Sequence, residues 1–475
     1  MIKQFKIILI TLAVVFTQGC DNDLNELNVD PNSAVNVDPS TLLTTAQYQL
    51  YNAMAGTTLN ADWGLLMVQY WAQNEYTEDS RYNQDITFFN GYWITFYASI
   101  IKELNAAKDL VAAQEVSDDI KTNRNNILNV MLAQAFISLT DGFGAIPFSE
   151  AINLDIPLPA YDSQETIYNA VLETLDIAST TFVPSANSFS SGDILYGGDV
   201  EKWKNFTNSL MLRYAMRIVD VDPATAATYI NKANSSLISS NAENALFTFE
   251  SSQDRSHPLY QNVAVNNRDD YCVSEYLVSK LTAMNDPRLE KFAKNASGGT
   301  IVGMPYGLSD NDATVLKPTT SRPNDAVREA TSAHAAMTYA EVQFLLAEAY
   351  QRGILSGIAE DAYKSGITAS LNQWGITDGT VVDNYIGANA YNAANWKESV
   401  GTQKWVAFYM DGYQAWCEWR RLDYPQLAVP ATALITSIPV RLPYPLSETQ
   451  NNSSNLGQIT STPAEMITKV WWDIN

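Results

Sequence analysis

The chain has 475 residues, of which 11% are aromatic, and its formal net charge at pH 7 is −23. This acidity argues against binding to nucleic acid and against attachment to anionic lipid through basic patches, because both partners would be repelled. A chain of this length can bury a large core without disulfides. We therefore expect Cys272 and Cys417 to be two buried thiols, with a disulfide between them as the alternative.

The N-terminus has the pattern of an export signal. Lys3 and Lys6 precede and flank an apolar run over 7–16, which is too short to cross a bilayer because a spanning helix needs about 20 apolar residues. Gly19-Cys20 ends the run, so we expect residues 1–19 to be removed and Cys20 to be lipidated. Thr17 stands where lipoprotein signals usually have Leu, and an ordinary secretory signal is the alternative. We expect a tether over 20–40 and a single domain over 41–475.

Apolar residues three and four positions apart predict a series of amphipathic helices in the mature chain. Ser40 is a suitable N-cap for the first helix. We expect the following stripes to face the core: Leu43, Gln47, Leu50 and Met54; Leu128, Leu132, Ala135 and Leu139; Ile167, Val171, Leu175 and Ala178; Trp203, Phe206, Leu210 and Tyr214; Val342, Leu345, Leu346 and Ala349; Tyr363, Ile367, Leu371 and Trp374; Trp405, Phe408, Tyr409, Gly412, Trp416 and Trp419.

The segment 337–374 predicts two helices joined by a turn that contains Gly353 and Gly357. Such a pair is similar to a tetratricopeptide unit, although no exact repeat runs through the chain. The stretches 182–199, 251–272, 296–335 and 375–397 are expected to be long loops. They contain Tyr, Trp, Arg and Asp rather than plain linker residues, so ordered binding loops are favoured.

The sequence carries no positive sign of catalysis. His257 and His334 have no second His or Cys at ligand spacing, which excludes a His-rich zinc site, and Gly197-Gly198 lacks the Lys of a phosphate loop. Asp310-Asn311-Asp312 could hold Ca²⁺ through its oxygens, with a solvated acidic turn as the alternative. Paired carboxylates for glycoside hydrolysis stay open, since such partners need only be close in space. We therefore expect a protein that is not an enzyme and has no cofactor.

Six phrases in the mature chain resemble, in the same order, the SusD/RagB family of nutrient-binding outer-membrane lipoproteins. They are DGFGAIPF over 141–148, NDPRL over 285–289, MTYAEVQFLLAEA over 337–349, QKWVA over 403–407, QAWCEWRR over 414–421 and IPVRLPYP over 438–445. The resemblance implies a mostly α fold in which tetratricopeptide-like helical repeats pack against a loop-rich ligand-binding region.

The resemblance also implies a lipid-anchored protein of the outer membrane at the cell surface. Such a protein would act as a lid on a SusC-like TonB-dependent barrel, to which it delivers an oligosaccharide. Peptide cargo is the main alternative. A surface glycoside hydrolase and a tetratricopeptide-like scaffold without a small ligand are weaker ones.

Family phrases do not locate the ligand, so candidate binding residues come from the chemistry of the loops. Aromatic rings beside amide and charged side chains suit a sugar, which offers a C–H face and hydroxyl groups. The predicted ligand-binding residues are Trp71, Asn74, Tyr76, Arg81 and Tyr82; Tyr260, Arg268 and Asp270, with Asn266 and Asn267 beside them; and Tyr306 and Arg322, with Asp310 and Asp312 between them. We expect Glu418, Arg420 and Arg421, on a Trp-rich helix, to form a buried ion network instead.

Overall fold

The computed structural model describes residues 37–85, 87–153, 155–456 and 463–474. The expected signal, the lipidation site Cys20 and most of the expected tether lie outside these residues. The chain divides into two units, Met1–Asp38 and Pro39–Asn475, and the helices and strands of the described residues all belong to the second unit. In the part of the chain that is described, no helix is both long enough and apolar enough to cross a membrane.

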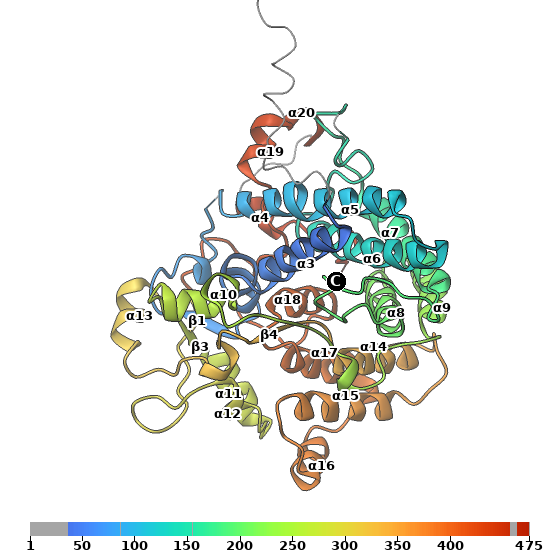
Figure 1. The fold of residues 1–475 in the computed structure, drawn as a ribbon. Coiled ribbons are helices and arrows are strands. Elements are labelled where there is room, and N and C mark those ends of the chain that lie inside the picture. Colours follow the sequence, from blue (N-terminus) through green and yellow to red (C-terminus); the bar gives the residue numbers. More distant parts are fainter. Residues whose placement is uncertain (1–36, 86, 154, 457–462, 475) are drawn as a thin grey trace, which may run out of the picture. The chain divides into compact units, whose positions relative to one another are not determined.

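The second unit consists mainly of helices (Figure 1), which confirms the predicted mostly α fold class. Its α-helices are α3 (Pro39–Ala55), α4 (Asn90–Ile94), α5 (Lys102–Ala113), α6 (Asp118–Phe143), α7 (Gln164–Thr181), α8 (Val200–Arg217), α9 (Pro223–Ala233), α10 (Pro258–Tyr260), α11 (Glu275–Ala283), α12 (Leu289–Phe292), α13 (Asp310–Leu316), α14 (Tyr339–Gln351), α15 (Ala359–Gln373), α16 (Gly379–Ala388), α17 (Trp396–Ala407), α18 (Gly412–Leu422), α19 (Leu446–Asn451) and α20 (Ser453–Leu456). Three π-helical segments are η1 (Thr57–Leu65), η3 (Thr95–Ile101) and η6 (Gln261–Val265).

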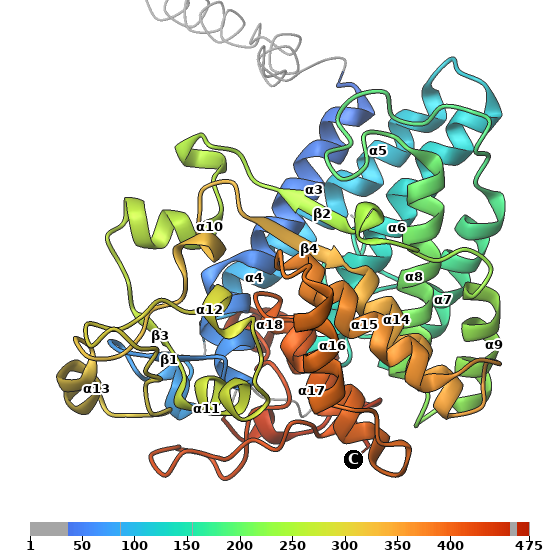
Figure 2. The same ribbon diagram turned by 90° about the horizontal axis from the view of Figure 1, so that it is seen from below.

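Helices that follow one another in the chain pack together in pairs, namely α6 with α7, α8 with α9, α14 with α15 and α17 with α18. Figure 2 shows α14 beside α15 as the sequence predicts. Thr338 caps α14 by accepting a hydrogen bond from the Glu341 backbone N–H at 3.2 Å. Gly366 on α15 lies against the Phe344 ring, where a Cβ atom would be 2.8 Å from the ring. The missing side chain therefore lets the two helices approach closely. Tetratricopeptide-like regularity of the pairs stays a prediction.

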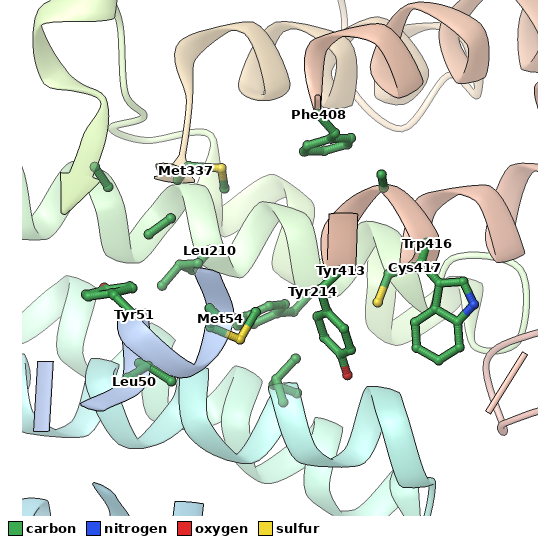
Figure 3. Close-up of a cluster of buried hydrophobic side chains, with 14 of the residues drawn as sticks. Leu50, Tyr51, Met54, Leu210, Tyr214, Met337, Phe408, Tyr413, Trp416 and Cys417 are labelled. Carbon is green, nitrogen blue, oxygen red and sulfur yellow. The ribbon is translucent and has the colours of Figure 1, made fainter. Parts of the chain in front are cut away.

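The core joins the first helix to the last long one. In Figure 3, Met54 of α3 lies beside Tyr214 of α8, and Leu50, Tyr413 and Trp416 belong to the same cluster. Gly64 of η1 lies directly against Gly412 of α18, and a Cβ atom on either residue would overlap the other's backbone. The N-terminal and C-terminal parts of the unit are thus packed backbone to backbone.

Two short antiparallel sheets connect distant parts of the chain. Strand β1 (Trp71–Gln73) pairs with β3 (Tyr271–Val273), and β2 (Ala245–Thr248) pairs with β4 (Ala333–Met337). The expected loop over 182–199 has no helix or strand, which confirms it.

The other three expected loops are partly helical: 251–272 contains α10 and η6, 296–335 contains α13, and 375–397 contains α16. The prediction of an unbroken loop was wrong for these segments. In the last, the Asp378 carboxylate caps α16 by accepting from the Thr380 N–H at 2.8 Å, and Val382 and Tyr385 bury one face of that helix.

A buried network of ion pairs links four helices. The Glu418 carboxylate of α18 contacts Lys404 of α17 at 2.5 Å, Arg421 of α18 at 2.8 Å and Arg217 of α8 at 3.3 Å. Arg421 also makes two 2.6 Å hydrogen bonds to Glu348 of α14. These contacts confirm the predicted network for Glu418 and Arg421.

Arg420 behaves differently from its neighbour Arg421. Its guanidinium lies over the Trp416 ring at 3.5 Å and donates to the backbone oxygens of Asp141 and Val440. It therefore connects the C-terminal segment to α6, and no ion pair of Arg420 is found in the described part of the chain, which corrects the prediction for this residue.

The Arg421→Met substitution is expected to lower the free energy of unfolding by about 3–5 kcal/mol, because it leaves two buried carboxylates without their main counter-charge. Urea unfolding followed by circular dichroism measures the loss. Lys364→Met, which breaks an exposed pair with Glu360, is the matched control and should change little. Equal losses in the two variants would contradict a stabilising role for the network.

Candidate functional site

The three segments that the sequence predicts to bind ligand come together in one region. We call residues 69–85, 258–274 and 301–328 the loop region. The β1–β3 pairing places Gln73 opposite Tyr271. Asp310 accepts a hydrogen bond from the Thr77 N–H at 2.9 Å, and Arg322 lies 3.3 Å from Asp269. The loop region is therefore one cross-connected body.

Several predicted binding residues form the interior of this region. Trp71 is fully buried and donates its indole N–H to the Tyr409 hydroxyl at 3.0 Å. Asn74 donates to the Asp269 carbonyl oxygen at 3.1 Å, and Tyr82 is buried with its ring 6.4 Å from that of Tyr306. In this structure these side chains support the loops and offer no free surface to a ligand.

Two other predicted residues are tied into local contacts. Arg81 donates to the Thr77 carbonyl oxygen at 3.2 Å, and Arg322 donates to the Cys272 sulfur at 2.6 Å. Cys272 and Cys417 are both free and buried, as expected.

Asp310 and Asp312 lie in the first turn of α13, where their charge favours the helix N-terminus. Among the described residues, no group of three His, Cys, Asp or Glu side chains is arranged to hold a metal ion.

Tyr76 and Arg268 are two predicted residues that reach solvent and contact each other. Tyr76 is 60% exposed and has a left-handed backbone with φ of 52°. The Arg268 guanidinium lies 4.6 Å from the centre of the Tyr76 ring and pairs with Asp270 at 2.7 Å. We call this pair the Tyr76 ledge. It offers an aromatic surface with a fixed cation beside it, which suits stacking against a ligand.

A groove of about 290 Å³ lies where α3 meets η1 and α4. Its walls combine amide and hydroxyl groups with aromatic rings. The lining includes Gln49 and Asn52 of α3, Thr57 and Thr58 of η1, Phe88 and Tyr92 around the start of α4, and Pro258 of α10. The predicted residue Tyr260 is half-buried at the end of α10, two residues beyond Pro258. The segment 258–270 thus runs from the groove to the Tyr76 ledge.

Sequence reasoning missed the groove residues of α3. Gln49 and Asn52 occupy the face of this helix that is opposite the apolar stripe, where polar residues are ordinarily solvated and carry no signal. The available sign was the pair of amides three residues apart, with Gly56, Thr57 and Thr58 beginning four residues after the second amide. Such a pattern indicates that polar side chains gather at the C-terminal end of the helix.

Two half-buried carboxyl groups contact the loop region from within or beside it: Asp79, which belongs to the region, and Asp62 of η1. The Tyr271 hydroxyl donates to Asp62, and Gln73 donates to Asp79 at 2.8 Å. Burial raises the pKa of Asp62 to about 8, and the nearby charge of Asp79 adds to the shift. Burial likewise raises the pKa of Asp79 to about 6.

These shifts predict that the free energy of unfolding falls as the pH rises from about 4 to about 8. Unfolded carboxyl groups titrate near pH 4, so within this window the native state holds protons that the unfolded state has lost. The double variant Asp62→Asn, Asp79→Asn should flatten the decline in urea unfolding between pH 5 and pH 9. The exposed Asp383→Asn is the control, and an unchanged slope in the double variant would contradict the assignment.

Comparison with known proteins identifies the family. The SusD-like family described as "Starch-binding associating with outer membrane" matches residues 31–445. No curated protein sequence matches the chain. A solved chitin-binding protein is 27% identical with a TM-score of 0.82, over 92% of this chain and 100% of that protein.

Two further solved structures share the fold. A SusD homologue from Bacteroides uniformis is 25% identical with a TM-score of 0.81, over 93% of this chain and all of its own. A chitin-binding SusD homologue from Flavobacterium johnsoniae is 23% identical with a TM-score of 0.79, over 92% of this chain and 98% of its own. The chain therefore belongs to the SusD-like family of glycan-binding proteins that associate with the outer membrane, and it is a binding protein rather than an enzyme.

Proposed function

We propose that this protein captures an oligosaccharide at the groove and the Tyr76 ledge and delivers it to a SusC-like TonB-dependent barrel. The acylated Cys20 and the residues up to about 40 would tether it at the cell surface, so that it opens and closes as a lid. The observation that carries the proposal is the groove itself, in which amides and hydroxyls share one 290 Å³ space with aromatic rings.

The chemistry of the groove suits a pyranose better than a charged ligand. Asn52, Gln49 and the two threonines can donate to and accept from sugar hydroxyls, while Phe88 offers a surface to the C–H face. None of the residues that line the groove is charged. A peptide would gain less here, because nothing in the lining pairs with its termini.

We propose oligomers of N-acetylglucosamine as the first cargo to test. The solved relative with 27% identity is named a chitin-binding protein, which supports this choice. The acetamido group of such a sugar carries one donor and one acceptor, and the amides of Asn52 and Gln49 can bond to both.

The groove predicts which variants lose binding. Asn52→Ala and Phe88→Ala should each weaken oligosaccharide binding about three- to tenfold, since each removes contacts worth about 0.5–1.5 kcal/mol. Titration calorimetry on residues 21–475, with chito-oligosaccharides, malto-oligosaccharides and a peptide library, measures the affinities. Asn231→Ala, an amide on the exposed side of α9, is the matched control.

Each binding result in this experiment leads to a different conclusion. Binding of peptides without glycans would replace the proposed cargo while leaving the lid role intact. Glycan binding that is unchanged in both groove variants would move the site elsewhere.

The tether predicts a second, independent result in cells. Cys20→Ala should move the protein from the outer-membrane fraction to the soluble fraction, because the acyl chains provide stable anchoring. Cys272→Ala, which alters a buried thiol of the loop region, should leave the fractionation unchanged. Co-purification of a TonB-dependent barrel with the wild-type protein tests the partner. Retention of Cys20→Ala in the outer membrane would mean a different anchor.

A further inference from the structure

A second cavity, of about 260 Å³, lies where α17 passes into α18, and its lining shares no residue with the groove. Exposed residues Ala326, Ala333 and Gln373 lie at its solvent side, whereas Phe408, Tyr409 and Asp411 line it from within and are buried. Its volume is enough for one ring-sized molecule.

Asp411 is a buried acid that makes no ion pair of its own within the described residues. The cations that act on it, Arg213 and Arg217 of α8, are paired with other carboxylates. Asp411 is 7% exposed, and its carboxylate accepts a 3.4 Å hydrogen bond from the Gln414 backbone N–H. No residue in the described part of the chain forms an ion pair with it. Asp411 also borders another, much smaller cavity, which His334 lines as well. A buried acid in this state ordinarily has a partner.

The backbone that presents Asp411 is held in an unfavourable conformation. Met410 has a left-handed φ of 79°, which is rare for a residue with a long side chain. Asn60 clamps this linker from both sides: its amide donates to the Met410 carbonyl oxygen at 3.1 Å and accepts from the Gly412 N–H at 2.8 Å. Strained linkers that a second element holds in place are typical of functional sites.

Aromatic rings line the same cavity as the acid. Trp374, Phe408 and Tyr409 line the cavity, and the rings of Trp374 and Tyr409 lie 6.1 Å apart. The indole N–H of Trp374 is buried and has no hydrogen-bond partner among the described residues, and the same holds for Nδ1 of His334. The Trp374 N–H and the His334 Nδ1 atom are thus available to form hydrogen bonds with a ligand.

The remaining charges around the cavity cancel. Glu341 is paired with Arg213 through a 2.6 Å hydrogen bond. Burial lowers the pKa of His257 to about 4 and that of His334 to about 3, so both imidazoles are neutral at pH 7. Burial also raises the pKa of Asp411 to about 7, which a bound cation would reverse by favouring the ionised form.

We propose that this cavity binds a small organic cation, namely a protonated primary amine on a ring-sized body. Its ammonium group would lie beside Asp411, and its body against Trp374, Phe408 and Tyr409. A carboxylate in a cavity that is also lined by aromatic rings is an arrangement that recognises ammonium groups. The Nδ1 atom of His334 can accept a further hydrogen bond from the same group. This site would act in addition to glycan capture at the groove and the Tyr76 ledge, and it does not depend on that function.

Cyclohexylamine and cyclohexanol form the test pair, because they have the same ring and differ in the charged group. Calorimetry on residues 21–475 at pH 8 should show the amine binding at least tenfold more tightly than the alcohol. Asp411→Asn keeps the N-cap of α18, since Asn caps helices as well as Asp does, and it should weaken amine binding at least tenfold. Asp378→Asn, the same change at the N-cap of α16, should have no effect.

Two further measurements distinguish an effect on amine binding from an effect on folding. Gln373→Trp fills the solvent side of the cavity from an exposed position and should block the amine while leaving thermal unfolding unchanged. Amine affinity should also fall from pH 8 to pH 6 as Asp411 takes up a proton; the groups facing it are Glu341 of α14, Arg213 and Arg217 of α8, and His334 of β4.

Three outcomes would overturn the proposal. They are equal binding of the alcohol and the amine, amine binding that Asp411→Asn does not change, and no binding of the amine at all. The groove variant Phe88→Ala should leave amine binding intact, so a failure here is distinct from a failure of the proposed glycan site.

Discussion

The arrangement of the helices depends on one carboxylate, that of Glu418. It faces three cations, which come from α8, α17 and its own helix, and Arg421 carries the contact on to Glu348 of α14. Removing these groups from water is costly, and only a complete set of partners offsets that cost. A shift of any one helix along its axis would leave a buried charge unpaired. The network therefore determines how the helices lie against one another. Apolar stripes alone would not fix the position of each helix along its axis.

The loop region is held together by weaker and more local means. Its two strands are three residues long, and the Lys317–Glu75 pair is partly exposed. It is joined to the helices through buried aromatic residues: Trp71 donates to Tyr409, and the Trp405 indole donates to the Val68 carbonyl oxygen at 3.0 Å. These contacts fix the base of the loop region on the helices.

Periodicity was enough to predict α3, α6, α7, α8, α14 and α15, because their apolar stripes repeat within a few residues of each other. It did not show that the stripe over 405–419 is broken between α17 and α18, nor that α16 forms within an expected loop. The pairing of α14 with α15 followed from a turn and small residues in the same short segment. The loop region could not be predicted in this way, since β1 and β3 are almost two hundred positions apart and only the folded chain shows their pairing. Trp71 and Tyr76 illustrate the limit. Both are aromatic residues in one polar stretch, yet pairing with β3 buries the first and a left-handed turn exposes the second. Local sequence does not distinguish them.

The same limit explains why Asp411 escaped notice. In sequence it is an ordinary N-cap before a helix, and its carboxylate does accept from the backbone of that helix. What makes it unusual is its surroundings, which are the strained Met410, the clamp from Asn60 and the hollow lined by Trp374. All three depend on where α18 lies, and Glu418 sets that position from the middle of the same helix. The ion network and the cavity are therefore two consequences of one constraint: the charges that lock α18 in place also hold its first residue, and the acid before it, against the cavity.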